Sequence, residues 1–225
     1  MIKKNLFLYF FIFQILLLFY LFNFYYDLTI WSVINKVLLF ESSTTSLELL
    51  KQKNFPLFSF DVNLGFPIFA DSQHGLFEPI NFLFLILFGP LEQINYSFFL
   101  HLILFISSLF FLLHRIYNID FNVALVVSIL NVFSPIIVGD ATHQNHLATV
   151  SYIPLSLILI EVFLLKDKFK NFILLFSPIV CFQLLSGHYQ YQLYCFIFYA
   201  LYFLISIFQN LNPLKKTLYQ IIIFF

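Results

Sequence analysis

The sequence predicts an all-α, polytopic transmembrane helix bundle that forms a single domain over residues 1–225. Hydrophobic residues make up 61% of the chain and charged residues only 10%, whereas soluble domains carry about 25% charged residues. The mean hydropathy is +0.93. Apolar runs long enough to cross about 30 Å of hydrocarbon alternate with short polar loops. Such a chain has too little polar surface to cover a water-exposed domain, so we expect it in a membrane.

The charged residues are sorted by loop, and this predicts the orientation of the chain. Cytoplasmic loops of membrane proteins collect Lys and Arg. Eight of the eleven basic residues form clusters that this rule places inside: Lys3, Lys4, Arg115, Lys166, Lys168, Lys170, Lys215 and Lys216. Eight of the eleven acidic residues lie between these clusters, on the predicted outer side: Asp27, Glu41, Glu48, Asp61, Asp71, Glu78, Glu92 and Asp140. We therefore expect a cytoplasmic N-terminus and a polar outer face. There is no basic patch that would suit nucleic acid.

Residues 5–93 are expected to form the first helix and the loop after it. Residues 5–26 are too long for the core of a cleaved signal peptide and no small-residue cleavage site follows, so they predict an uncleaved transmembrane helix. Residues 27–93 form a long outer loop with short surface helices. Ser46 is expected to cap an amphipathic helix at the membrane surface. Residues 80–88 are apolar but too short to span, which predicts an interfacial or re-entrant helix.

Further spans follow from the remaining apolar runs. They are expected at residues 94–113, 121–139, 147–165, 171–187 and 189–208. Another run begins near Leu218, and a helix that stopped at Phe225 would leave unpaired carbonyls in hydrocarbon. We therefore expect the chain to be the N-terminal part of a longer protein. Within the spans, Glu161 is expected to snorkel toward the lysine loop after it or to pair there, and His101 to be a packed, satisfied histidine.

Three motifs occur in order along the chain. The first runs through Asn54-Phe55-Pro56-Leu57-Phe58, Gly65-Phe66-Pro67 and Ala70-Asp71-Ser72-Gln73-His74-Gly75-Leu76-Phe77-Glu78-Pro79-Ile80-Asn81. The second is His143 and His146 followed by Pro154, and the third is Gly187-His188-Tyr189-Gln190. Together they resemble the signature of the YfhO-type bacterial membrane proteins, a branch of the GT-C glycosyltransferase superfamily. The resemblance covers most of residues 47–208. The chain departs from the pattern at Phe58-Ser59-Phe60, where the family has Trp-Asn-Pro, and at Phe77-Glu78 and Ile80.

The resemblance implies a GT-C-like bundle in the bacterial cytoplasmic membrane, with its site on the outer face. It implies transfer of a sugar from a polyprenyl-phosphate donor to a cell-envelope acceptor. This chemistry needs a carboxylate to accept a proton from the attacking hydroxyl, and a cation or a bound metal to stabilise the departing phosphate. The catalytic candidates are Asp27 or Glu41 as the base and Asp71 as a pocket or metal carboxylate. Each has a structural alternative: a polar helix stop for Asp27, a solvated loop acid for Glu41 and an Asx-turn for Asp71.

The substrate-binding candidates are polar residues of the predicted outer face. They are Lys51, Lys53, His74, His143, His146, His188 and Gln190. The lysines could bind donor phosphate or form the polar side of a surface helix. Asp140, His143 and His146 could ligate a divalent cation, line a substrate cavity, or cap and hydrogen-bond a helix. The expected partners are a polyprenyl-phosphate sugar and membrane lipid.

Two other functions compete with the enzyme. A transporter or flippase for lipid-linked saccharides predicts charged or broken sites near mid-membrane and internal repeats. The sequence shows only Pro135, Pro154 and Pro178 inside spans, with no intramembrane ion pair and no repeat. A non-catalytic envelope protein predicts no dependence on any outer carboxylate. The polar residues gather at one face instead of the midplane, which favours the enzyme.

Overall fold

The computed structural model describes residues 43–59, 65, 67–70, 75–134, 137, 144–166 and 168–209, and it is mostly helical, without a β-strand in those residues. The all-α class predicted from the sequence is therefore confirmed for this part of the chain. The predicted first helix at residues 5–26 and the apolar run after Leu218 lie outside the described residues.

The helices follow the apolar runs of the sequence closely. After a helix at residues 43–51, the elements are α3 (Pro79–Phe88), α4 (Pro90–Phe111), the π-helix η2 (Leu112–Ile116), α5 (Phe121–Leu130), the 3₁₀-helix η3 (Asn131–Phe133), α7 (Gln144–Ser151), α8 (Ile153–Leu159), the π-helix η5 (Ile160–Leu164), α9 (Phe169–Leu185) and α10 (Tyr189–Gln209). The short helix predicted at residues 80–88 is α3, and the runs predicted to span correspond to α4 through α10.

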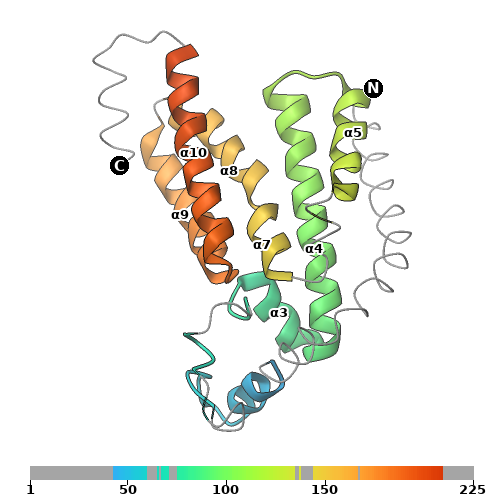
Figure 1. Ribbon diagram of the computed structural model, residues 1–225, viewed down its shortest axis with the longest axis vertical. Helices are drawn as coiled ribbons and strands as arrows, with labels where there is room; N and C mark the ends of the chain where they lie inside the picture. Colours follow the sequence, from blue (N-terminus) through green and yellow to red (C-terminus); the bar gives the residue numbers. More distant parts are fainter. Residues whose placement is uncertain are drawn as a thin grey trace.

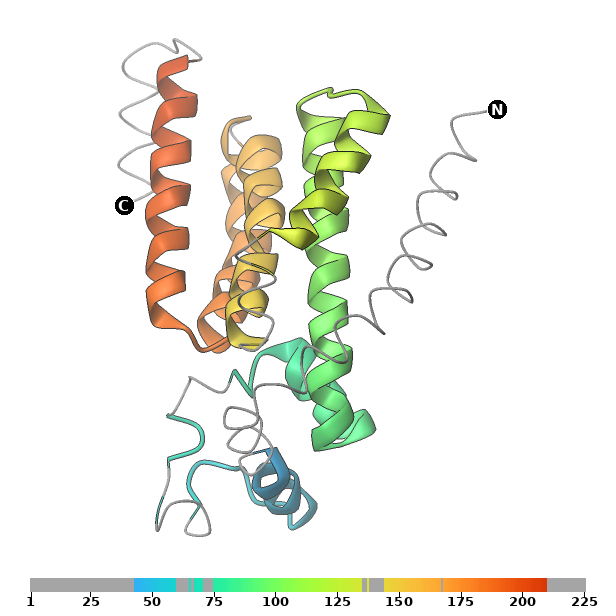
Figure 2. The ribbon, with the colours of Figure 1, turned by 45° about the vertical axis from the view of Figure 1, so that its right-hand side comes forward.

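The long helices lie side by side and alternate in direction (Figures 1 and 2). We call one end of this bundle the α3 end: α3, the start of α7 and the α9–α10 turn lie there, with the helix of residues 43–51 beyond α3. The opposite end, which we call the basic end, contains the η2–α5 and η5–α9 connections. Arg115 lies in η2, and Lys166 and Lys168 lie between η5 and α9. The described basic residues of the predicted inner loops are therefore at one end of the bundle.

Local sequence explains where the helices begin and break. Pro79 and Pro90 occupy the first turns of α3 and α4, where a missing N–H costs nothing. Asp120 caps α5 by accepting a hydrogen bond from the Asn122 backbone N–H at 2.9 Å. The helix of residues 43–51 already contains Ser46, so the predicted capping role of Ser46 is wrong.

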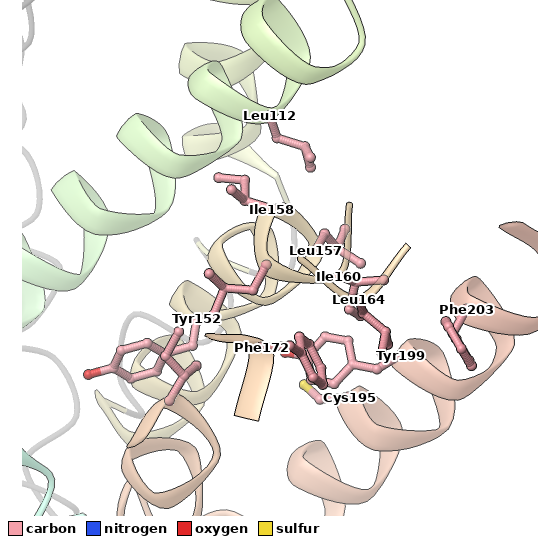
Figure 3. Close-up of a cluster of buried hydrophobic side chains, with 12 residues drawn as sticks. Leu112, Tyr152, Leu157, Ile158, Ile160, Leu164, Phe172, Cys195, Tyr199 and Phe203 are labelled. Atoms are coloured by element: carbon pink, nitrogen blue, oxygen red, sulfur yellow. The ribbon is translucent and has the colours of Figure 1, made fainter. Parts of the chain in front are cut away.

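The largest apolar cluster packs α8, η5, α9 and α10 against one another (Figure 3). Its most buried large side chains include Ile160, Tyr199 and Phe203. Tyr152 belongs to the same cluster, yet its hydroxyl points away from the other labelled side chains. This hydroxyl points toward the polar residues of the α3 end.

In the described part of the chain, two helical stretches are long and apolar enough to cross a membrane, Pro90–Ile116 and Asn145–Leu164. Pro79–Phe88, Phe121–Phe133 and Phe169–Leu185 are apolar but shorter. The polytopic arrangement therefore stays a prediction beyond the all-α class.

Candidate functional site

Several residues of the predicted site lie outside the described part of the chain. These are the three catalytic candidates Asp27, Glu41 and Asp71, together with His74 and His143. Their predicted roles stay predictions, and the site is built here from the residues around them.

Two predicted substrate-binding histidines meet at the α3 end. His146, near the start of α7, and His188, in the turn before α10, have ring centroids 4.0 Å apart at an interplanar angle of 76°. Tyr191 of α10 stacks on His146 with centroids 4.5 Å apart. The backbone N–H of Tyr191 also donates to Nδ1 of His188 at 3.3 Å. The structure therefore joins the second and third motifs of the sequence into one aromatic and imidazole cluster.

The other described candidates lie around this cluster or away from it. Gln190 is exposed, and its Nε2 donates to the Tyr194 hydroxyl at 2.7 Å. Lys51 and Lys53 are exposed at the end of the helix of residues 43–51. Figure 1 shows that helix beyond α3, away from the α9–α10 turn. The lysines are therefore on a different element from the histidine pair.

The most buried charged group of the α3 end is Glu78, whose relative exposure is 0%. Its Oε1 accepts a hydrogen bond from the Tyr152 hydroxyl at 2.5 Å. Its Oε2 accepts from the Asn81 backbone N–H at 2.8 Å, which makes Glu78 the N-cap of α3. The same Oε2 lies 3.3 Å from Nε2 of His101, which is also fully buried. One carboxylate thus contacts α3, α4 and the α7–α8 junction.

His101 extends this network into the bundle. Its Nδ1 lies 3.0 Å from the Ser151 hydroxyl at the end of α7. Its ring also packs edge-on against Tyr152, with centroids 5.9 Å apart. We call Glu78, Asn81, His101, Ser151 and Tyr152 the Glu78 network.

Burial and hydrogen bonding act on the pKa of Glu78 in opposite directions. Burial is the largest single influence and raises the pKa, because a carboxylate loses its hydration. The His101 imidazole, the Tyr152 hydroxyl and the Asn81 N–H all favour the charged form and together outweigh burial. The pKa of Glu78 is therefore held below its ordinary value, and Glu78 is a carboxylate at neutral pH.

Gly75 ties the network to the end of α9. Its φ is +58°, a left-handed conformation that favours glycine, and a Cβ there would lie 2.5 Å from the Ser186 carbonyl oxygen. The Gly75 carbonyl accepts a hydrogen bond from Nδ2 of Asn81 at 2.8 Å. Ser186 directly precedes the turn that holds His188. The Gly75–Asn81 part of the first motif is thus packed beside the third motif.

A second polar group lies between α7, α9 and α10. Gln183 is fully buried, and its Nε2 lies 3.0 Å from the Thr149 carbonyl and 2.9 Å from the Tyr199 hydroxyl. Nε2 of Gln192 donates to the Gln183 carbonyl at 2.7 Å, and the Thr149 and Ser186 hydroxyls are 2.5 Å apart. These bonds hold the α9–α10 hairpin against α7.

Sequence reasoning missed the Glu78 network. It treated His101 as a packed histidine and Glu78 as a departure from a motif. His101 lies within Pro90–Ile116 and its Nε2 is 3.3 Å from Glu78, which precedes α3 outside the predicted spans, so the expectation that the spans hold no ion pair stays a prediction. An ionisable residue inside an apolar run was the available signal, since such residues usually face a partner in the bundle. Glu161 accepts a hydrogen bond from the Tyr202 hydroxyl, and its expected snorkelling toward the lysine loop stays a prediction.

The predicted divalent-cation site stays a prediction. Among the described residues, no group of three or more His, Cys, Asp or Glu side chains could hold a metal ion. Asp140 and His143, which the sequence places with His146 in that site, lie outside those residues.

Comparison with protein-family models, with curated proteins and with solved structures gives no match for this chain.

Proposed function

We propose that this chain is part of a membrane-embedded glycosyltransferase that moves a sugar from a polyprenyl-phosphate donor to an acceptor of the cell envelope. The observation that carries the proposal is the meeting of the three motifs at the α3 end. Gly75 of the first motif packs on Ser186 beside the third motif. His146 of the second motif contacts His188 of the third. Segments far apart in the sequence that converge with imidazole, amide and carboxylate groups are typical of a binding or catalytic site.

The distribution of polar and apolar side chains supports a membrane location. Leu174 is 72% exposed, and apolar side chains such as Leu193 and Leu201 are also exposed along α10. Polar side chains such as Gln183 and Ser156 are fully buried instead. Exposed apolar faces around an interior that also contains polar side chains are costly in water and favourable in lipid.

In this proposal the carboxylates of the first loop supply the base. Asp27 or Glu41 accepts the acceptor hydroxyl proton as that oxygen attacks the anomeric carbon, and the sugar–phosphate bond breaks. Asp71 belongs to the same motif as Gly75 and contributes a pocket carboxylate. His146, His188 and Gln190 contact the sugar or the phosphate. Lys51 and Lys53 meet donor phosphate at the membrane surface, and His74 joins the motif residues of the pocket.

The test is sugar transfer in membranes that contain the protein, with a labelled polyprenyl-phosphate sugar pool. Asp27→Asn, Glu41→Gln and Asp71→Asn are compared at matched expression with Asp120→Asn, an exposed acid at the basic end. Loss of a general base is expected to reduce transfer about 10²–10⁴-fold, and Asp120→Asn should transfer like the parent. Absence of transfer in the parent, or full transfer in all three loop variants, would overturn the proposal.

A transporter or flippase for lipid-linked saccharides is the second candidate. The buried Glu78–His101 pair favours it, because ionisable pairs inside membrane bundles often mark transport or proton pathways. Reconstituted vesicles separate the two functions. Movement of an intact lipid-linked saccharide across the bilayer, without cleavage of the sugar–phosphate bond, would support transport, whereas transfer without movement supports the enzyme.

A further inference from the structure

The hydrogen bonds around His101 indicate how many protons its ring carries. The Ser151 hydroxyl donates to the Ala148 carbonyl at 2.8 Å. A hydroxyl has only one hydrogen, and while Ser151 donates it to this carbonyl, its oxygen can only accept from His101. In that arrangement Nδ1 of His101, 3.0 Å away, carries a hydrogen. This assignment uses one of the two ring nitrogens and leaves the other to be explained.

Nε2 of His101 faces Oε2 of Glu78 at 3.3 Å. In a neutral imidazole only one nitrogen carries hydrogen, so Nε2 would present a lone pair to a carboxylate oxygen. Both sides are fully buried, and two lone pairs facing each other there would be unfavourable. A second hydrogen, on Nε2, removes this conflict and makes the contact an ion pair, although the two atoms do not meet the geometry of a hydrogen bond.

We propose that Glu78 and His101 form a carboxylate–imidazolium pair, and that this pair is the positioning group that fixes the Gly75–Asn81 motif at the α3 end. The proton sits on Nε2, because the carboxylate already accepts from Tyr152 and from the Asn81 N–H. An ionised carboxylate accepts hydrogen bonds on both of its oxygens more strongly than a protonated acid would, which favours the proton on His101 and not on Glu78. The pair as a whole is neutral, which lowers the cost of burying it.

The groups that face the pair come from every element packed around it. Asn81 belongs to α3 itself, and Ser151 and Tyr152 belong to the α7–α8 junction. From α9, Phe182 packs against the Tyr152 ring with centroids 6.1 Å apart. The described contacts of Glu78 therefore include one cation, His101.

The pair acts on the motif through a short chain of contacts. Glu78 holds the Asn81 N–H, and Nδ2 of Asn81 holds the Gly75 carbonyl. Gly75 in turn lies against Ser186, next to the turn that holds His188. The side chains of Glu78 and His101 are themselves fully buried. Their contribution to a site is thus to hold its backbone in place, and this part of the proposal rests on the proposed function.

The first experiment reads the ring protons directly. Protein labelled with ¹⁵N-histidine is studied by NMR in nanodiscs at neutral pH, with His101→Gln to assign the signal. We expect both ring nitrogens of His101 to be protonated in the parent, and only one in Glu78→Gln. His114→Gln is the matched control from the other end of the same helical stretch and should leave the His101 signal unchanged. A neutral His101 ring in the parent overturns the proposal.

A double-mutant cycle tests the pairing by comparing the thermal midpoints of the two single variants and the double variant with that of the parent. His101→Gln leaves a buried carboxylate without its cation, and Glu78→Gln leaves an imidazole without its anion. The double variant Glu78→Gln/His101→Gln removes both charges, so its thermal midpoint should lie closer to the parent than that of His101→Gln. Additive losses in midpoint would mean simple packing and would overturn the pair.

The positioning role is tested by sugar transfer in the same variants. Transfer should fall in both single variants and recover in part in the double variant, because the motif is held again once no unpaired charge remains. Equal loss in all three variants would overturn the positioning role. If the parent shows no transfer, the proposed function fails, while the NMR result and the cycle still decide whether the charged pair exists.

Discussion

The two ends of the bundle each contain a glutamate that accepts a tyrosine hydroxyl, yet their surroundings differ. At the α3 end, Glu78 is fully buried and is bonded to Tyr152 and paired with His101. At the basic end, Glu161 in η5 is only half-buried, and it accepts from Tyr202, whose hydroxyl also contacts Tyr117. The same side-chain chemistry thus occurs in the interior at one end and near the surface at the other.

Burial determines what each carboxylate requires. A charge removed from water loses several kcal/mol of hydration, so it is retained only where a counter-charge and further hydrogen bonds replace the water. Glu78 has both. A partly solvated carboxylate keeps water, and its pairs contribute about 0–1 kcal/mol. The comparison teaches that the Glu78 network holds the fold together at the α3 end, whereas the Glu161 contacts contribute little.

Removal of the cation should have the largest effect. His101→Leu leaves Glu78 charged and unpaired in the interior, and we expect the free energy of unfolding to fall by about 3–5 kcal/mol. Denaturation in detergent micelles measures this. The control is His114→Leu, because His114 is half-buried and bonds the Ile119 carbonyl at 3.0 Å, so its loss should cost about 1 kcal/mol. Equal losses in the two variants would contradict the comparison.

The second-largest loss of stability is expected from a substitution of Gly75, the glycine that packs the first motif against the end of α9. Gly75→Ala forces a left-handed φ on alanine and places Cβ 2.5 Å from the Ser186 oxygen. The conformational strain is about 1–2 kcal/mol, and the clash adds about 1–3 kcal/mol.

Gly75→Asn is the matched control for this glycine. Asparagine adopts the left-handed conformation more readily than alanine, but its Cβ would still lie 2.5 Å from the Ser186 oxygen. It should therefore show the clash with less of the strain. Thermal unfolding of both variants separates the two contributions, and a Gly75→Asn protein as stable as the parent would show that the contact with Ser186 carries no energy.

Much of the fold could be predicted from the sequence, because apolar length and proline placement are local signals. The run at residues 80–88 gave α3, with Pro79 in its first turn. The pairing of His146 with His188 also agrees with their predicted placement at one end of the bundle.

The Glu78 network could not be predicted because it depends on how three distant elements meet. Glu78 and Tyr152 are far apart in the chain, and no local pattern pairs them. Ser46 illustrates the opposite case. Its local pattern predicted a helix N-cap, but the helix includes residues before Ser46 and contains it. Local rules therefore predict the helices, whereas contacts between buried polar groups can be identified only in the assembled structure.

A smaller effect compares the two tyrosines. Tyr152→Phe removes a hydrogen bond to a fully buried carboxylate, and hydrogen bonds to charged groups contribute about 1.5–3 kcal/mol. Tyr202→Phe removes the corresponding bond to the half-buried Glu161, where water can replace it, so we expect about 1 kcal/mol or less. Chemical denaturation of both variants measures the two losses. A larger loss in Tyr202→Phe would reverse the assignment of the interior network to the α3 end.

Acidification should give the smallest and most specific difference. The pKa of Glu78 is lower in the folded protein than its ordinary value, because the bonds of its network outweigh burial. The folded state therefore gains stability from Glu78 above the ordinary glutamate pKa of about 4.3, and this gain is lost as the pH falls through the lowered value. The parent should lose up to about 1.4 kcal/mol per pH unit more than Glu78→Gln in that window. In Tyr152→Phe, one of the bonds that lower the pKa of Glu78 is gone, so the loss of stability should be smaller and complete at a higher pH. Unfolding curves recorded across this pH range for the three proteins measure these losses of stability. If the parent and Glu78→Gln lose stability equally as the pH falls, the network does not stabilise the charged form of Glu78.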